Sequence, residues 1–216
     1  REPPIGIACL ETRRIDEHVW VRTIEYICPN IAQIPRTPIF PPRYREGEDE
    51  LVYVPLVTRW RVPIDDSNTA EFAFVRVAPG EENTYITDPG PVVRTNYGGR
   101  TYEEMQREPG DYEAQMSQRA IARHGAEHLG ATDRGVIMMR RMVREGIRAV
   151  AAAKDPKGLR RALDGPIPTY GSDTVRRIPP AGTPEADSAI LRETMAAVIE
   201  RSLASPPIAS TDQFAV

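Results

Sequence analysis

Two sets of side chains between residues 110 and 142 have the chemical character of metal ligands. The first is the pentapeptide His124-Gly125-Ala126-Glu127-His128, which matches the H-x-x-E-H pattern of inverted zinc peptidases. Residues four apart share one face of a helix, so both imidazoles could bind one Zn²⁺ while Glu127 acts as general base toward a metal-bound water. The second is the single carboxylate of Asp111. A lone Asp at a helix start is normally a capping residue and by itself indicates no metal site.

The sequence around the pentapeptide favours a turn over a zinc-binding helix. Gly125 and Gly130 weaken helical structure, and no hydrophobic helix surrounds them. Thr132 provides an N-cap for a helix that starts only after the pentapeptide. We therefore interpret Glu127 and His128 as hydrogen-bonding residues at a turn before this cap.

A longer pattern changes the interpretation of Asp111. The string D-Y-E-A-Q-M-S begins at Asp111, and E-H-L-G-A-T-D-R-G-V-I-M-M-R-R-M runs from Glu127 to Met142. Together they resemble the C-terminal half of the oxygenase component of Rieske-type non-haem iron ring-hydroxylating oxygenases, in the phthalate dioxygenase-like branch. The resemblance covers most of residues 5–155. Further landmarks of that family are Tyr26-Ile27-Cys28-Pro29, Val62-Pro63-Ile64-Asp65-Asp66 and Arg140-Arg141.

The resemblance implies that Asp111 is one ligand of a mononuclear Fe(II). Two neutral imidazoles and one carboxylate on one face of Fe(II) leave open positions for O₂ beside the substrate. In the family the two His ligands lie in an upstream H-x4-H-like segment, and the Rieske [2Fe-2S] cluster lies in an N-terminal domain, so both are expected outside this chain. Gly110, Met116 and the pair Gln118-Arg119 depart from the family pattern around the carboxylate, which bears on substrate scope more than on the metal.

By the same resemblance the chain is the C-terminal part of an oxygenase that hydroxylates or O-demethylates an aromatic substrate. Electrons from a reductase or ferredoxin would reach the iron through the Rieske centre, and the family implies a homotrimer. The resemblance identifies no further catalytic or substrate-binding side chain. Two alternatives remain open. One is a zinc metallohydrolase using His124, Glu127 and His128; the other is a non-catalytic helix-grip ligand-binding domain, which is suggested by the lack of both iron-binding histidines in this sequence.

Composition argues against several other classes of protein. The chain has 28 basic and 31 acidic residues, and a net charge of -3 gives no electrostatic footprint for nucleic acid or an anionic membrane. No apolar run approaches the roughly 18 residues of a membrane span. The polar residues 1–4 are unlike a signal sequence and look like a cut into a longer chain. Cys9 and Cys28 lie in apolar runs without metal-ligand spacing, which favours buried thiols in a reducing cytoplasm over the alternative of a disulfide between them.

Period-two apolar patterns predict an antiparallel sheet. The run from Val19 to Cys28 is apolar on both alternating faces, which is typical of a strand covered on both sides. Alternating side chains from Val52 to Val62 and from Ala70 to Val77 predict two more strands, joined by a turn at residues 65–68. Residues 35–50 are Pro-rich and then charged, which indicates an exposed loop.

Two helices are predicted after the sheet. Apolar residues recur at helical spacing from Val136 to Val150, and a last helix is expected at about residues 184–204. The Gly- and Pro-rich residues 156–180 are predicted to be irregular. This order indicates an α+β fold, and the resemblance makes it the helix-grip type, in which an antiparallel sheet wraps a long C-terminal helix. We assign residues 1–172 to the C-terminal portion of the helix-grip catalytic domain and residues 173–216 to the C-terminal helix and tail.

Overall fold

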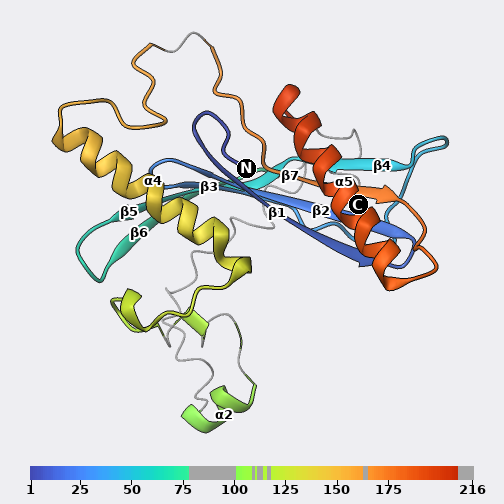
Figure 1. The fold of residues 1–216 in the computed structure, drawn as a ribbon, viewed down its shortest axis with the longest axis horizontal. Coiled ribbons are helices and arrows are strands. Elements are labelled where there is room, and N and C mark those ends of the chain that lie inside the picture. The colour runs from blue at the N-terminus through green and yellow to red at the C-terminus, as the bar shows by residue number, and fades with distance from the viewer. Residues whose placement is uncertain (78–100, 109, 111–113, 116–117, 163–164, 209–216) are drawn as a thin grey trace.

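The fold combines an antiparallel sheet with two long helices packed on it (Figure 1). The computed structural model describes all residues except 78–100, 109, 111–113, 116–117, 163–164 and 209–216. Within the described residues the sheet has seven strands, and a long helix follows it near the C-terminus. The predicted α+β fold of the helix-grip type is therefore confirmed. None of the described helices is both long and apolar enough to cross a lipid bilayer.

Strands come first along the chain, and one strand returns between the two long helices. The strands are β1 (Gly6–Ile15), β2 (His18–Ile27), β3 (Ile31–Pro35), β4 (Glu50–Tyr53), β5 (Pro55–Pro63), β6 (Thr69–Val75) and β7 (Ser172–Arg177). The α-helices of the described residues are α2 (Tyr102–Arg107), α4 (Arg134–Ala151) and α5 (Pro184–Ala204), and short 3-10 turns occupy His124–Ala126 and Ala131–Asp133.

β2 is the centre of the sheet because strands pair along both of its edges. β1 pairs with all 10 of its residues. On the other edge β7 pairs with residues 18–23 and β3 with residues 25–27, so these two strands lie end to end beside β2. In the next position β4 pairs with β7, and β5 pairs with β3. β6 then pairs with β5 and forms the outer strand of this side.

The predicted burial of β2 on both faces is confirmed. On one face Val21 is fully buried against Val198 of α5. On the other face His18 and Trp20 are buried, and each ring centroid lies 6.0 Å from that of Phe40. The alternation of a strand sends these two sets of side chains in opposite directions, so β2 holds two layers together.

α5 is capped at its start and is fixed to β1 and β2 by one ion pair and an apolar cluster. Thr183 Oγ1 accepts a hydrogen bond from the Ala186 amide at 3.2 Å, and Pro184 occupies the first helical turn. Arg14 binds both carboxylate oxygens of Asp187, at 3.1 and 2.5 Å. The helix thereby lies across the sheet (Figure 1). Around the buried valines of β2 and α5 pack the partly buried side chains of Leu10, Ile178, Ile190, Leu191 and Met195.

α4 contacts β1 on the face opposite to α5. A Cβ placed on Gly135 would lie only 2.8 Å from Cys9 Sγ, so the helix and the strand approach closely at this point. Further along α4, Met142 Sδ lies 3.9 Å from Cys28 Sγ. Cys9 alternates along β1 with Leu10, which packs in the α5 cluster. Because successive strand residues point to opposite faces, the two helices use different faces of β1.

β7 corrects the prediction that residues 156–180 are irregular. The strand is buried from Ser172 to Val175 and pairs with both β2 and β4. Its polar composition hides the strand pattern, and burial is tolerated because Arg22 binds the Asp173 carboxylate with contacts of 2.8 to 3.2 Å. The division of the chain after residue 172 remains a prediction.

The Pro-rich residues 35–50 are also less exposed than predicted. Tyr44 stacks on His18 with ring centroids 5.8 Å apart, and the Arg177 guanidinium lies 4.5 Å from the Tyr44 ring centroid. Phe40 covers the same face of β2. The loop therefore contributes a covering layer, because aromatic side chains between the prolines bury their rings on the strand.

Candidate functional site

The predicted iron ligand Asp111 lies outside the described residues, and its geometry is not part of the structure. The residues that the structure does describe contain no group of three His, Cys, Asp or Glu side chains placed to hold a metal ion. The described part of the chain therefore does not form a complete metal site by itself.

The zinc pentapeptide does not form the helix that its pattern requires. Residues His124–Ala126 make one 3-10 turn, and the backbone at Glu127 is extended, with φ -86° and ψ 141°. Residues i and i+4 of this segment thus do not share a helical face, and His124, Glu127 and His128 do not form a metal-binding group. The interpretation as a turn before the helix is confirmed.

Glu127 is instead bound to an arginine of α4. Arg140 Nη1 and Nη2 donate to its two carboxylate oxygens at 2.5 and 2.9 Å, with both side chains about three-quarters buried. The hydrogen bond from Arg140 lowers the pKa of Glu127, which is therefore a poor proton acceptor for a metal-bound water. This bidentate pair holds the segment after Asp111 against α4.

The start of α4 differs from the predicted cap. Thr132 lies inside the 3-10 turn Ala131–Asp133, and α4 begins two residues later with Asp133 at its N-cap position. The Asp133 side chain makes no cap hydrogen bond to the helix because its Oδ2 already accepts the Gly130 amide at 2.8 Å. The prediction of Thr132 as the cap is therefore wrong, although the helix itself is confirmed.

The two cysteines are free, half-buried thiols at the contact between α4 and the sheet. Burial raises the pKa of both Cys9 and Cys28, which favours the neutral thiol at neutral pH. The prediction of reduced, buried thiols agrees with this arrangement. Their role is to pack α4 closely on β1 and the end of β2.

A buried carboxylate that the sequence analysis missed lies where β3 gives way to β7. Glu25 is fully buried, and its Oε2 accepts the Tyr170 amide at 2.6 Å. Burial raises its pKa, and backbone hydrogen bonds from Tyr170 and Gly171 partly oppose the rise. The β2–β3 pairing ends at Glu25 and Gln33, and the β2–β7 pairing begins at Thr23 and Ser172, so Glu25 lies at the junction and accepts the amide of Tyr170 just before β7.

Four polar atoms around Glu25 have no hydrogen-bond partner among the described residues. They are Thr23 Oγ1, Glu25 Oε1, Gln33 Oε1 and Ser172 Oγ. Thr23 is paired with Ser172 and Glu25 with Gln33 across the strands, so all four side chains project from one face of the sheet. The set offers two hydroxyl groups and two acceptor oxygens in the interior. The only sequence signal for this polar set was the charge of Glu25 in the apolar run of β2.

On the opposite face of β2, an arginine neutralises the buried carboxylate of Asp173. Asp173 is bound by Arg22, whose guanidinium lies 4.9 Å from the ring centroid of Trp20. Arg13 lies 5.1 Å from the same ring centroid. Burial still raises the pKa of Asp173, but the hydrogen bonds and charge of Arg22 oppose this. In contrast, no described residue forms a salt bridge with Glu25.

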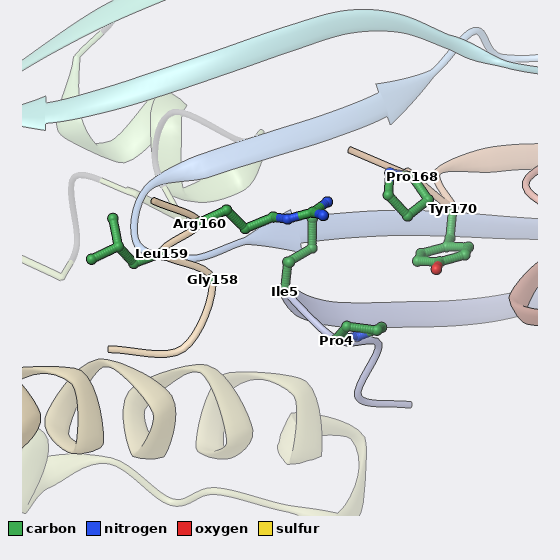
Figure 2. A pocket seen from close by; sticks show the side chains of 7 residues that line it. All are labelled: Pro4, Ile5, Gly158, Leu159, Arg160, Pro168 and Tyr170. Atoms are coloured by element: carbon green, nitrogen blue, oxygen red, sulfur yellow. The ribbon is translucent and has the colours of Figure 1, made fainter. Parts of the chain in front are cut away.

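One open hollow lies beside this buried junction (Figure 2). Its volume is about 390 Å³, and its lining is mainly apolar. The lining residues are Pro4, Ile5, Gly158, Leu159, Arg160, Pro168 and Tyr170. Figure 2 shows the Arg160 side chain extending above Ile5, with Pro168 and Tyr170 on one side. The lining contains no metal-binding side chain, so the hollow could hold a small apolar molecule but not a metal.

Comparison with known proteins points to oxygenases. No known family profile matches the chain. The oxygenase subunit of tert-butanol monooxygenase/tert-amyl alcohol desaturase from Aquincola tertiaricarbonis is 35% identical over 198 residues, or 87% of this chain. The alpha subunit of phenoxybenzoate dioxygenase from Ectopseudomonas oleovorans is 29% identical over 137 residues, or 61% of this chain. The oxygenase subunit of 5,5'-dehydrodivanillate O-demethylase from Sphingobium sp. (strain NBRC 103272 / SYK-6) is 29% identical over 126 residues, or 54%.

The match covers only part of each relative. The chain spans 40% of the length of the first and 29% of the other two, and in the first it matches the C-terminal part. All three relatives are subunits of Rieske oxygenases. The resemblance predicted from the motifs around Asp111 and Glu127 is thereby confirmed.

Proposed function

We propose that this chain is the C-terminal part of the catalytic domain of a Rieske-type non-haem iron oxygenase. The observation that carries the proposal is the similarity to an oxygenase subunit over 87% of the chain, aligned with the C-terminal part of that subunit. The helix-grip sheet and the motif that contains Asp111 agree with it. Residues 1–172 then belong to the catalytic domain, and residues 173–216 form its C-terminal helix and tail.

In this proposal Asp111 supplies the carboxylate of a mononuclear Fe(II) site, and the two imidazole ligands come from outside this chain. A ferrous ion held by two imidazoles and one carboxylate keeps positions open for O₂. A Rieske [2Fe-2S] cluster outside the chain would pass on electrons from a reductase or ferredoxin. We also propose the homotrimer and the cytoplasmic location that the family implies.

The contribution of the described residues is to position the segment that carries Asp111. The Glu127–Arg140 pair holds the chain 16 residues beyond Asp111 against α4. α4 in turn packs on the sheet through Gly135 and Met142. We propose that this brace limits the movement of the carboxylate relative to the sheet.

The names of the relatives span two classes of substrate. Phenoxybenzoate and 5,5'-dehydrodivanillate are aromatic, whereas tert-butanol and tert-amyl alcohol are aliphatic tertiary alcohols. We propose an aromatic substrate that is hydroxylated or O-demethylated. A tertiary alcohol is the second candidate, because the relative with 35% identity over most of this chain is named for such alcohols.

Replacement of the proposed ligand tests the function. Asp111→Ala in the protein as its gene encodes it should reduce iron content and NADH-dependent turnover. The reduction should exceed the roughly 10–100-fold that the loss of a supporting residue costs. Iron is measured by elemental analysis, and turnover with phenoxybenzoate and with tert-butanol as separate substrates.

The matched control is Asp66→Ala, which removes an exposed carboxylate from the turn between β5 and β6. This variant should keep normal iron and turnover. Normal iron and turnover in Asp111→Ala would refute the proposed ligand. A wild-type protein that binds aromatic compounds but neither iron nor O₂ would instead support the non-catalytic ligand-binding domain.

A further inference from the structure

α4 carries two apolar stripes, and only one of them faces the sheet. Consecutive residues of a helix are rotated by roughly 100°, so Gly135, Met139, Met142 and Gly146 form one narrow stripe. This stripe lies on β1 and the end of β2, and Met142 is its buried member. Its small and flexible residues let the helix approach the strand closely.

The second stripe lies about a quarter turn around the helix and is exposed. It consists of four β-branched side chains, whose exposed fractions are 38, 40, 64 and 62%. They are Val136, Val143, Ile147 and Val150. The face opposite to this stripe carries Arg141, Arg144 and Arg148, with the exposed Ile137 among them. A continuous row of branched apolar side chains beside a charged face is the pattern of an interface, because isolated exposed residues would not align.

We propose that this exposed stripe is the contact surface for polypeptide that corresponds to the N-terminal part of an oxygenase subunit. The chain matches the C-terminal part of a relative of which it spans 40%, so a comparable partner polypeptide would be larger than this chain. The inference rests on the proposed function, because the oxygenase relatives define the occupant. It adds to that function the surface through which the two parts of the subunit meet.

One edge of the stripe adjoins the Glu127–Arg140 pair. Arg140 lies on the helix between the directions of Ile147 and the charged face, and it binds Glu127. The stripe is therefore bordered by Glu127. Polypeptide packed on Ile147 and Val143 would lie beside the Glu127–Arg140 pair.

Cysteine labelling of the assembled protein tests this surface. In the protein as its gene encodes it, Ile147→Cys should react with a maleimide at least about 10-fold more slowly than Arg148→Cys, because a packed site reacts only through local opening. Arg148 is the matched control, since it is the next residue of the same helix on the charged face. Val143→Cys is the second variant, should Ile147→Cys fold poorly.

A cross-linker attached at Ile147→Cys identifies the occupant by mass spectrometry. Cross-links to polypeptide that precedes residue 1 in the encoded protein would support the proposal. Equal labelling rates at the two positions would overturn it. Cross-links confined to residues 1–216, or to α4 of a second copy, would also overturn it. Neither readout needs iron, so failure of the Asp111 experiment and failure of this one are separable.

Discussion

The two long helices pack very differently, although the sequence predicts both. α5 has 21 residues and buries Val198 and Ile199 to 2% exposure, whereas α4 has 18 residues and buries only Met142. The regular apolar spacing of α4 makes it the clearer helix in the sequence. It is nevertheless the helix with the more exposed apolar side chains. Helical periodicity thus indicates that a face will be covered, but not which part of the protein covers it.

A similar difference separates two parts of the sheet. Near α5, Arg22 of β2 binds the buried Asp173 of β7, and Arg14 of β1 binds the partly buried Asp187 of α5. At the other end β5 and β6 carry exposed aromatic side chains, and their ion pairs are open to water. We infer that the part of the sheet under α5 is more stable than the end formed by β5 and β6.

The largest difference should appear when an ion pair is broken at each end. Arg22→Ala should lower the free energy of unfolding by about 3 kcal/mol, because it leaves the fully buried Asp173 carboxylate without its partner. Urea unfolding of the 216-residue chain measures the change.

Arg61→Ala is the control at the other end of the sheet. Its ion pair with Glu71 is 3.3 Å long, and both side chains are about half exposed. The loss should stay below about 1 kcal/mol, because water and salt already screen such a pair. Equal losses in the two variants would contradict the division into a stable and an open end.

A pair of valine truncations compares the helices directly. Val198→Ala should cost about 2 kcal/mol, since it removes two buried methyl groups and leaves a cavity beside Val19 and Val21. Val143→Ala should cost less than about 1 kcal/mol in the 216-residue chain, because the side chain is 40% exposed. Both values come from urea unfolding.

The same two variants test the proposed contact surface on α4. In the protein as its gene encodes it, the cost of Val143→Ala should rise toward that of Val198→Ala, because the exposed stripe of α4 is then covered. A cost for Val143→Ala that is the same in both forms would indicate that α4 gains no partner.

Substitutions at the starts of the two helices should have smaller effects on stability. Thr183→Ala should cost about 1 kcal/mol, because the hydroxyl group accepts the Ala186 amide at the start of α5. Thr132→Ala should cost at most a few tenths of a kcal/mol, because Thr132 makes no cap hydrogen bond to α4. The melting temperatures of the two variants rank these effects. A larger loss of stability for Thr132→Ala than for Thr183→Ala would support Thr132 as the N-cap predicted from the sequence.

The fold was predictable wherever apolar periodicity decides the structure. The two-sided pattern of β2 and the helical spacing of α4 both appear in the structure. β7 was missed because its buried residues are mostly polar, and their burial depends on Arg22, which lies 151 positions away from Asp173 in sequence. A local pattern cannot contain a partner at that separation.

The site was predictable only as far as the motif resemblance reaches. The H-x-x-E-H spacing is compatible with a zinc helix, but two glycines and the Arg140 partner convert it into an anchored turn. Glu25 gave only the signal of one charge in an apolar strand, and its role depends on where β3 diverges from β2. Asp111 remains a prediction that rests on the family pattern.

The last comparison concerns the sign of two pH dependences. Burial raises the pKa of Glu25 above its ordinary value of 4.5, so the folded chain keeps this proton where the unfolded chain has lost it. Its contribution to stability is complete below pH 4.5 and is lost as the pH rises through the raised pKa. The hydrogen bond from Arg140 lowers the pKa of Glu127, so its contribution is complete above 4.5 and is lost as the pH falls.

Glu25→Gln and Glu127→Gln separate these effects from all other titrating groups. The stability of wild type relative to Glu25→Gln should decrease as the pH rises above 4.5, while the stability relative to Glu127→Gln should decrease as the pH falls below 4.5. Urea unfolding at a series of pH values measures both differences. Slopes of the same sign would indicate that a cation lies beside Glu25 in solution. The unpartnered oxygens of Thr23, Gln33 and Ser172 would then be the protein atoms nearest to that cation.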